Sequence, residues 1–492
     1  MSAAGPQPPG GATTRPAPRA SRRARGVERP LIVLALLCYA YFVPRGVNWN
    51  ADSHLALTRA LVERHTAVID AYAAGLGDRS FYHGHYYTDK APGLSLLAVP
   101  AYLLLKALLG PAFFGALFFV VRYLITLLVV GLPTALAAAT LSRRLRPHVG
   151  VRGALTAAAV WALGTLAFPY STVFFSHQMA AVLLLVAFLA LYLPAAPAVP
   201  VSMASRLGIG LLCGVAVACE YPTLLLAAVL LGGRVLLARS PRAAVTWALP
   251  LGAGMLVGVA PALIYNSLIF GGPLAQGYAH LGGQQQFIKG MSQGVMGITG
   301  PSLEALWGIT FSPYRGLFLI SPFLLLAVPG LRAMWRTRPL VVGNQVGPRA
   351  AAVVCATCVV VYGLFNISYL FWNGGFSVGP RHFTPALPYL IVPCAFALRS
   401  QRVRRLAGPL ALYSVSAMLL AEATAPLFSP DLLNPLFGWA PTRLLAGHVA
   451  NNWGFSLGLR GAASVLPLLV MGALLLTLLW RRVSSLERGL PT

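Results

Sequence analysis

The chain has 492 residues, of which 57% are hydrophobic and only 10% are charged, and its formal net charge is +26. This composition excludes an ordinary soluble globule and predicts an all-α polytopic membrane protein, because a bilayer offers no water to unpaired backbone groups. The positive charge does not indicate nucleic-acid binding, since the arginines lie in short clusters between apolar runs, where such residues orient membrane helices.

Residues 1–29 are rich in Pro, Gly, Ala and Arg, which predicts a disordered basic cytoplasmic tail. If all later basic clusters also face the cytoplasm, the apolar runs between them pair as out-and-back hairpins. We therefore predict one transmembrane domain, 30–480, with about twelve spans, and a second cytoplasmic tail, 481–492. The predicted spans are 30–47, 113–142, 151–169, 179–195, 206–219, 222–238, 243–268, 315–331, 350–370, 384–398, 405–425 and 459–480.

Segment 93–110 is apolar enough to form a helix, but Pro100 and Lys106 interrupt it. Counting it as a span would move the next basic cluster, 143–146, to the outside and invert every later loop. We therefore predict a juxtamembrane or re-entrant helix at the outer interface. The main outer loops are then 48–112 and 269–314. The cytoplasmic connections are too short for a soluble domain, so the active site is expected on the outer face of the plasma (inner) membrane.

The first outer loop is exceptional because it holds five of the chain's eleven acidic residues, between Asp52 and Asp89. Residues 50–65 have the pattern of an amphipathic helix that begins near Asp52. Two roles are open for this carboxylate. It could stabilise the helix N-terminus, or it could accept a proton from an acceptor hydroxyl at the membrane surface. His54 and Arg59 lie on the same predicted helix and are candidate supporting residues.

Residues 81–92 gather four aromatic side chains, two histidines and the pair Asp89–Lys90 just before the 93–110 helix. Adjacent residues point in different directions in regular structure, so this pair need not neutralise itself. A lysine at the interface suits a lipid phosphate. The alternative is a lysine that extends toward water beside tyrosines of the interfacial belt.

The order of these features resembles the GT-C class of membrane glycosyltransferases, which take sugars from polyprenyl-phosphate carriers. The resemblance is to the branch with protein O-mannosyltransferases and aminoarabinose transferases, and rests on an acid after the first span and the run Tyr87-Thr88-Asp89-Lys90-Ala91-Pro92. It implies a large first outer loop with juxtamembrane helices, Asp52 as catalytic base, and Lys90 as a ligand of the carrier phosphate. One departure is Glu220, which stands where the aminoarabinose branch has a lysine and is therefore a candidate site residue.

The later outer loops add further candidates. By the same resemblance, His280 would face the first loop and could pair with Asp89, directly or through a divalent metal, although a lone His and Asp do not define a ligand set. Two arginines at the outer ends of spans suit phosphate, or else anchor the helices at the interface. The candidate phosphate ligands are Arg315 and Arg381, and the candidate supporting residues around sugar or acceptor are Tyr87, His177, Trp372 and His382.

These features predict an inverting glycosyltransferase that moves a monosaccharide from a polyprenyl-phosphate carrier to an acceptor hydroxyl. The sequence does not name the sugar or the acceptor, which could be protein, lipid or polysaccharide. It indicates no cofactor beyond the metal left open above. Two other functions remain: a transferase like O-antigen ligases or polymerases with a pyrophosphate-linked donor, and a transporter or flippase. The charges crowd the outer interface instead of the mid-membrane positions that transporters favour.

Overall fold

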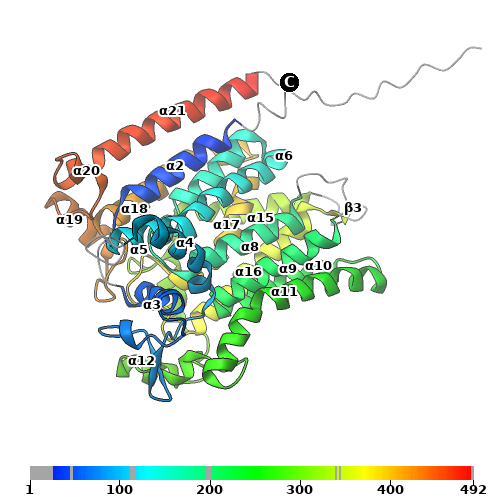
Figure 1. The fold of residues 1–492 in the computed structure, drawn as a ribbon. Helices are drawn as coiled ribbons and strands as arrows, with labels where there is room; N and C mark the ends of the chain where they lie inside the picture. The colour runs from blue at the N-terminus through cyan, green and yellow to red at the C-terminus, as the bar shows by residue number, and fades with distance from the viewer. Residues whose placement is uncertain are drawn as a thin grey trace, which may run out of the picture.

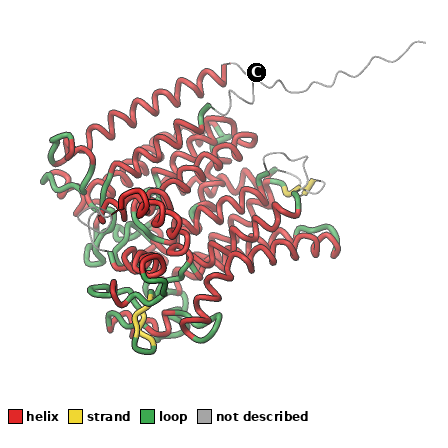
Figure 2. The backbone as a smooth tube through the Cα atoms, in the orientation of Figure 1, coloured by secondary structure: helices red, strands yellow, loops and turns green. Residues whose placement is uncertain are grey.

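Most of the chain folds into helices (Figures 1 and 2) in the computed structural model, which describes residues 26–44, 48–110, 118–194, 201–337, 341–342 and 345–488. The helices are α2 (Glu28–Tyr41), α3 (Trp49–Glu63), α4 (Gly93–Leu109), α5 (Phe118–Thr126), α6 (Leu132–Leu163), α7 (Pro169–Thr172), α8 (Ser176–Tyr192), α9 (Met203–Cys219), α10 (Leu224–Leu236), α11 (Pro241–Phe270), α12 (Gln285–Met291), α13 (Leu303–Thr310), α14 (Leu317–Ile320), α15 (Ala327–Arg336), α16 (Pro348–Ser368), α17 (Pro388–Ala397), α18 (Gln401–Thr424), α19 (Ala440–Leu445), α20 (Trp453–Ser456) and α21 (Leu466–Arg488).

Short 3-10 or π turns and two hairpins complete the described part. The turns are η1 (Asp70–Tyr72), η3 (Leu127–Gly131), η4 (Tyr221–Thr223), η5 (Gly277–His280), η6 (Pro322–Leu326), η7 (Arg381–Ala386), η8 (Pro435–Trp439) and η9 (Gly461–Val465). The hairpins pair β1 (Ser80–Tyr82) with β2 (His85–Tyr87), and β3 (Val341–Val342) with β4 (Gln345–Val346), both antiparallel.

Helices overlap all twelve segments predicted to cross the membrane, and a helix also forms over the 93–110 segment, as α4. Within the described ranges, five helical stretches are both long and apolar enough to span a bilayer: Phe118–Leu163, Pro241–Phe270, Pro348–Ser368, Gln401–Thr424 and Gly461–Arg488. The chain is thus built as an integral membrane protein. The number of crossings and the interfacial position of α4 stay predictions. Residues 1–25 of the predicted N-terminal tail lie outside the described residues.

The longest of these stretches is two helices joined at Gly150, whose φ of +76° is a left-handed conformation that glycine adopts without strain. Tyr123 donates from its hydroxyl to the carbonyl of Ala40 at 2.6 Å, and Tyr39 donates to that of Ala162 at 2.9 Å. Along one straight helix, residues 123 and 162 would lie about 60 Å apart. The helix therefore folds back at Gly150, where the sequence places the boundary between spans 113–142 and 151–169.

Both ends of the described chain lie at the same end of the bundle, near the mark C in Figure 1. Arg482 donates to the carbonyl of Gly26 at 2.6 Å, and Arg152 forms an ion pair with Glu487 at 2.6 Å. The hairpin β1–β2 and helices α3 and α12 lie toward the opposite end. This arrangement is the one that the predicted topology requires, and the assignment of the basic end to the cytoplasm stays a prediction.

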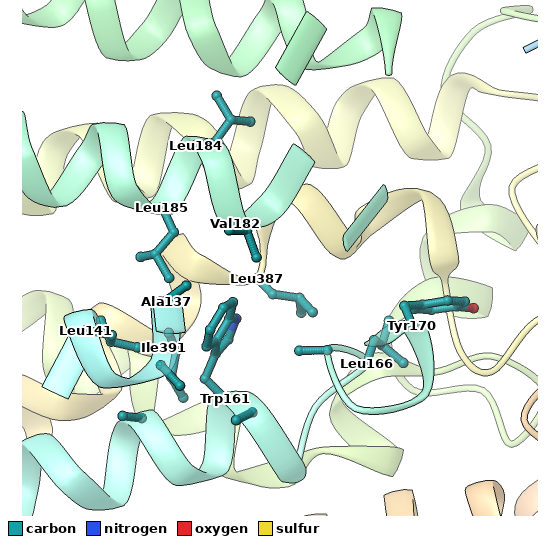
Figure 3. Close-up of a cluster of buried hydrophobic side chains, with 14 of the residues drawn as sticks. Ala137, Leu141, Trp161, Leu166, Tyr170, Val182, Leu184, Leu185, Leu387 and Ile391 are labelled. Atoms are coloured by element: carbon teal, nitrogen blue, oxygen red, sulfur yellow. The ribbon is translucent and has the colours of Figure 1, made fainter. Parts of the chain in front are cut away.

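A buried cluster fixes the middle of the bundle (Figure 3). Trp161 packs among Ala137 and Leu141 from the first arm of α6, Leu185 from α8 and Ile391 from α17, and all five side chains are buried. Lipid is as apolar as these side chains, so close van der Waals packing must hold such helices together. The cluster therefore sets the positions of α8 and α17, which lead into the functional site described below.

Helices α9 and α11 pack through glycines so closely that their backbones touch. A Cβ atom at Gly254 would collide with the carbonyl of Leu207, and one at Gly214 with the carbonyl of Met255. G254A should therefore lower the free energy of unfolding by about 1–3 kcal/mol, the usual cost of overpacking. Thermal unfolding in detergent measures the effect against G252A, because a Cβ at Gly252 meets nothing within 4 Å. Equal melting temperatures for the two variants would contradict the tight contact.

Candidate functional site

Lys90 lies between two carboxylates in the first outer loop. Its Nζ is 2.9 Å from Asp89 Oδ2 and 3.0 Å from Asp78 Oδ2. The side chains of Lys90 and Asp89 are buried, while that of Asp78 is 22% exposed. The expectation that Asp89 and Lys90 point apart is therefore wrong. The backbone here is not a regular strand or helix, so adjacent side chains can turn toward each other.

The hairpin β1–β2 brings these acids together. Its register pairs Ser80 with Tyr87, and continuing that register places Asp78 opposite Asp89. Ser80 donates from Oγ to the carbonyl of Gly277 at 2.7 Å, which ties the hairpin to the second outer loop. A Cβ at Gly277 would come within 3.0 Å of the Asp89 Cα, so only glycine allows this approach.

The charges of this group follow from burial and pairing. Burial raises the pKa of the Asp89 carboxyl to about 6, and the neighbouring Lys90 ammonium opposes that rise. Burial would lower the pKa of Lys90, but Asp78 and Asp89 more than offset it and hold the pKa well above its usual value. Lys90 is therefore a cation at every physiological pH. An ammonium has three N–H donors, so a third remains beyond the two carboxylates.

Aromatic rings of the second outer loop lie beside Lys90. Its Nζ is 5.5 Å from the ring centroid of Tyr278 and 5.9 Å from that of Phe287. Both distances suit a cation–π interaction. The first and second outer loops thus meet at this lysine, although they are almost 200 residues apart in the sequence.

A second buried group joins the outer ends of α8, α9 and η7. His177 Nδ1 lies 2.9 Å from Glu220 Oε2, and Ser176 donates from Oγ to the same oxygen at 2.6 Å. The ring of His382 stands edge-on to that of His177, with centroids 5.2 Å apart, and edge-on to that of Tyr369, at 5.3 Å. The structure thus brings together three candidates that are far apart in the sequence.

His54 is within electrostatic range of both groups, since, besides burial, the Lys90 charge lowers its pKa and the Glu220 charge raises it. It is fully buried on α3, with its ring edge-on to Phe174 and its Nδ1 3.4 Å from Ser95 Oγ, while its Nε2 has no hydrogen-bond partner. Burial, with a smaller contribution from the Lys90 charge, lowers the pKa of His54 to about 3. Its imidazole is therefore neutral at physiological pH.

Asp52 lies in the first turn of α3, as predicted, and its contact with Asn48 fits the role at the helix N-terminus, while the role as a base stays a prediction. Oδ2 accepts from the backbone N–H of Asn48 at 2.9 Å, and Oδ1 lies 3.1 Å from Arg122 Nη1. The side chains of Asp52 and Arg122 are each 18% exposed. The next residue, Ser53, lies 2.8 Å from Thr88 (Oγ to Oγ1), so the first turn of α3 contacts the segment that carries Lys90.

A small cavity of about 40 Å³ adjoins the Asp52–Arg122 pair. It is lined by Pro44, Asn48, Ala51, Arg122, Tyr123, Thr126, Thr172, Val173 and Phe174. This volume holds about one water molecule. A reacting hydroxyl or a single water therefore fits there.

The two candidate arginines have different surroundings. Arg315 is fully buried, and its guanidinium donates to the carbonyls of Asn373, Tyr314, Gly375 and Ser429 at 3.1–3.3 Å. Arg315 therefore ties these loop segments together, and its role as a phosphate ligand stays a prediction. The Nε of Arg381, in contrast, is buried without a hydrogen-bond partner, and its Cζ lies 5.4 Å from the Phe175 ring centroid. Arg381 keeps a donor for a ligand.

The remaining predicted residues lie in packing contacts. Arg59 forms an ion pair with Glu63 at 3.2 Å and covers the ring of Tyr72. The ring of Tyr87 packs on Phe270 and that of Trp372 on Tyr314, both edge-on. These contacts do not bring Arg59 or Trp372 to Lys90.

The side chains of His280 and Asp89 pack against or bind other residues instead of each other. The His280 ring packs against Tyr82 at 4.3 Å and stacks on Phe270, while the Asp89 carboxylate binds Lys90. In the described part of the chain, no three His, Cys, Asp or Glu residues gather as a metal site would require. The arrangement therefore gives no support to a metal at these two residues.

Sequence reasoning missed three residues of this region: Asp78, Arg122 and Tyr278. Asp78 is one of the five acids of the first outer loop, but it does not lie beside a membrane end, so the sequence gives no reason to single it out. The aromatic run around His83-Gly84 could have corrected this, since a turn there predicts a hairpin whose ends bring Asp78 to Asp89. No local signal could have paired Arg122 with Asp52, because 70 residues separate them.

The fold and site define a helical membrane protein in which the loops that carry Lys90 and Tyr278 meet over a buried group of charged residues. ArnT from Cupriavidus metallidurans in the apo state has a similar structure, with a TM-score of 0.51 and 16% identity over 96% of the present chain and 75% of ArnT. ArnT bound to undecaprenyl phosphate aligns over the same shares, with a TM-score of 0.48 and 17% identity. No protein-family model matches the sequence, and no curated protein matches it significantly. The resemblance to GT-C enzymes is thereby confirmed at the level of the fold.

Proposed function

We propose that the chain is an inverting glycosyltransferase that takes a monosaccharide from a polyprenyl-phosphate carrier. The observation that carries this proposal is the buried Lys90, whose two carboxylate partners leave one of its three N–H groups for a ligand, in an ArnT-like fold. A solved ArnT structure holds undecaprenyl phosphate, which is a ligand of the proposed kind. We place the site on the outer face of the plasma membrane, with both chain termini in the cytoplasm.

In this mechanism, Lys90 and Arg381 bind the carrier phosphate. Lys90 offers its third N–H and Arg381 its unpartnered Nε. Asp52 removes the proton from the acceptor hydroxyl, whose oxygen attacks the anomeric carbon opposite the phosphate. The anomeric C–O bond then breaks and its electron pair leaves on the phosphate oxygen, which inverts the configuration. Charge-assisted donors placed at the leaving oxygen stabilise that transition state.

Purified protein incubated with membrane extract tests the donor class. We expect labelled sugar to move to an acceptor from one or more polyprenyl-phosphate sugars, and not from the corresponding nucleotide sugars or polyprenyl-pyrophosphate sugars. R381Q should raise KM for the donor about tenfold or more, because a hydrogen bond to a charged group is lost. R399Q, at an exposed arginine between α17 and α18, is the matched control. Transfer from pyrophosphate donors alone, or sugar transport into vesicles without a glycosylated product, would refute the proposal.

A further inference from the structure

The two ring nitrogens of His177 have different surroundings. Its Nδ1 faces Glu220 Oε2 at 2.9 Å, while its Nε2 is buried and has no hydrogen-bond partner in the protein. The side chain is only 5% exposed. A buried polar nitrogen without a partner is costly, so its retention points to a ligand that binds it.

Glu220 is held so that it faces His177. It follows the last residue of α9, and the Ser176 hydroxyl donates to the same oxygen that lies near His177. Because Nδ1 faces this carboxylate, Nε2 is the ring nitrogen of His177 that remains for a ligand. The other titratable or charged groups around the pair come from neighbouring elements: His54, Lys90, Cys219, Tyr362, Tyr369, Arg381 and His382. Tyr278 also lies within electrostatic range of Glu220.

The charge of the leaving group changes during the reaction. A sugar-linked carrier phosphate is a diester with one negative charge, whereas the released polyprenyl phosphate is a monoester that approaches two at neutral pH. Lys90 shares its charge with two carboxylates. A further proton donor at the phosphate would stabilise the charge that develops.

We propose that His177, positioned by Glu220, donates its Nε2 proton to the carrier phosphate as the anomeric C–O bond breaks. The inference rests on the proposed function. The acceptor proton goes to Asp52, the bond electrons go to the phosphate oxygen, and the His177 proton joins that phosphate. Neutral His177 then regains a proton from water, and Asp52 releases one to water. His177 is thus a catalytic acid, and Glu220 is a positioning residue that acts through it.

A binding measurement with undecaprenyl phosphate, the kind of product that the proposed reaction releases, tests this inference separately from sugar transfer. The probes are undecaprenyl phosphate and its methyl diester, titrated into detergent-solubilised full-length protein. The wild type should prefer the monoester by about 10- to 100-fold, the range for a hydrogen bond between charged groups. H177N should lose most of that preference and keep its affinity for the diester. H148N is the matched control, because His148 packs on Phe396, away from these residues.

E220Q provides a second measurement that does not remove the imidazole. Without the Glu220 carboxylate, the His177 ring loses the group that its Nδ1 faces, so the monoester preference should fall about tenfold or more while the affinity for the diester stays. A purely structural role for Glu220 would weaken the binding of both probes equally and leave the monoester preference in place. An unchanged monoester preference in a folded H177N would overturn the inference and leave the donor class standing. Failure of the wild type to bind undecaprenyl phosphate at all would overturn the donor class and this inference together.

Discussion

D52N is expected to reduce kcat by about 100- to 10,000-fold, the usual contribution of a positioned general base. Asparagine keeps an oxygen that can accept from the Asn48 N–H, but it cannot take up the acceptor proton. The variant should therefore remain folded and still bind undecaprenyl phosphate. Single-turnover transfer from a polyprenyl-phosphate sugar that the wild type uses measures the loss.

Two further variants separate the role of Asp52 as a base from its role in the ion pair with Arg122. R122Q removes the cation 3.1 Å from Asp52 and keeps the carboxylate, so its loss should stay within about tenfold. E304Q is the control, because it changes an exposed acid that also lies in the first turn of a helix, α13, and should leave transfer unchanged. If R122Q and D52N fell by the same factor, Asp52 would act through the ion pair and the assignment as base would have to be withdrawn.

K90M should be the most destabilising of the site substitutions. It leaves two carboxylates facing each other without the cation between them, one of them fully buried. Breaking a buried ion pair from one side costs about 3–5 kcal/mol, and the partial exposure of Asp78 places the expected loss near the lower value. Thermal unfolding measures it against K289M, since Lys289 is exposed on α12.

The destabilisation expected for K90M should depend on pH. The pKa of Asp89 in the folded protein is raised to about 6, so its carboxyl is largely neutral below that pH and ionised above it. The destabilisation by K90M should therefore be small at pH 5 and grow as the pH rises through 6 to 8. The triple variant D78N/K90M/D89N should recover stability without recovering transfer. Recovery of both would show that Lys90 only neutralises its neighbours.

Sequence reasoning worked best where a local physical rule sufficed. Apolar length and charge clusters located the helices, and helix-cap chemistry located the start of α3 near Asp52. It worked less well where the answer depends on side chains meeting from distant segments. Arg315 and Arg381 have similar sequence surroundings, yet Arg315 donates to four backbone carbonyls whereas Arg381 keeps an unpartnered nitrogen. That difference arises from the path of the 373–375 and 429 segments, which no local pattern encodes.

The ion pairs of Lys90 also bear on which anions can reach it. A soluble phosphate ion must compete with Asp78 and Asp89 at its own bulk concentration, and one free N–H gives it little advantage. A phosphate attached to a membrane lipid is confined to the plane of the bilayer, so its local concentration near the loop is far higher. The two carboxylates would then act as a filter that rejects free anions and admits those that membrane anchoring delivers.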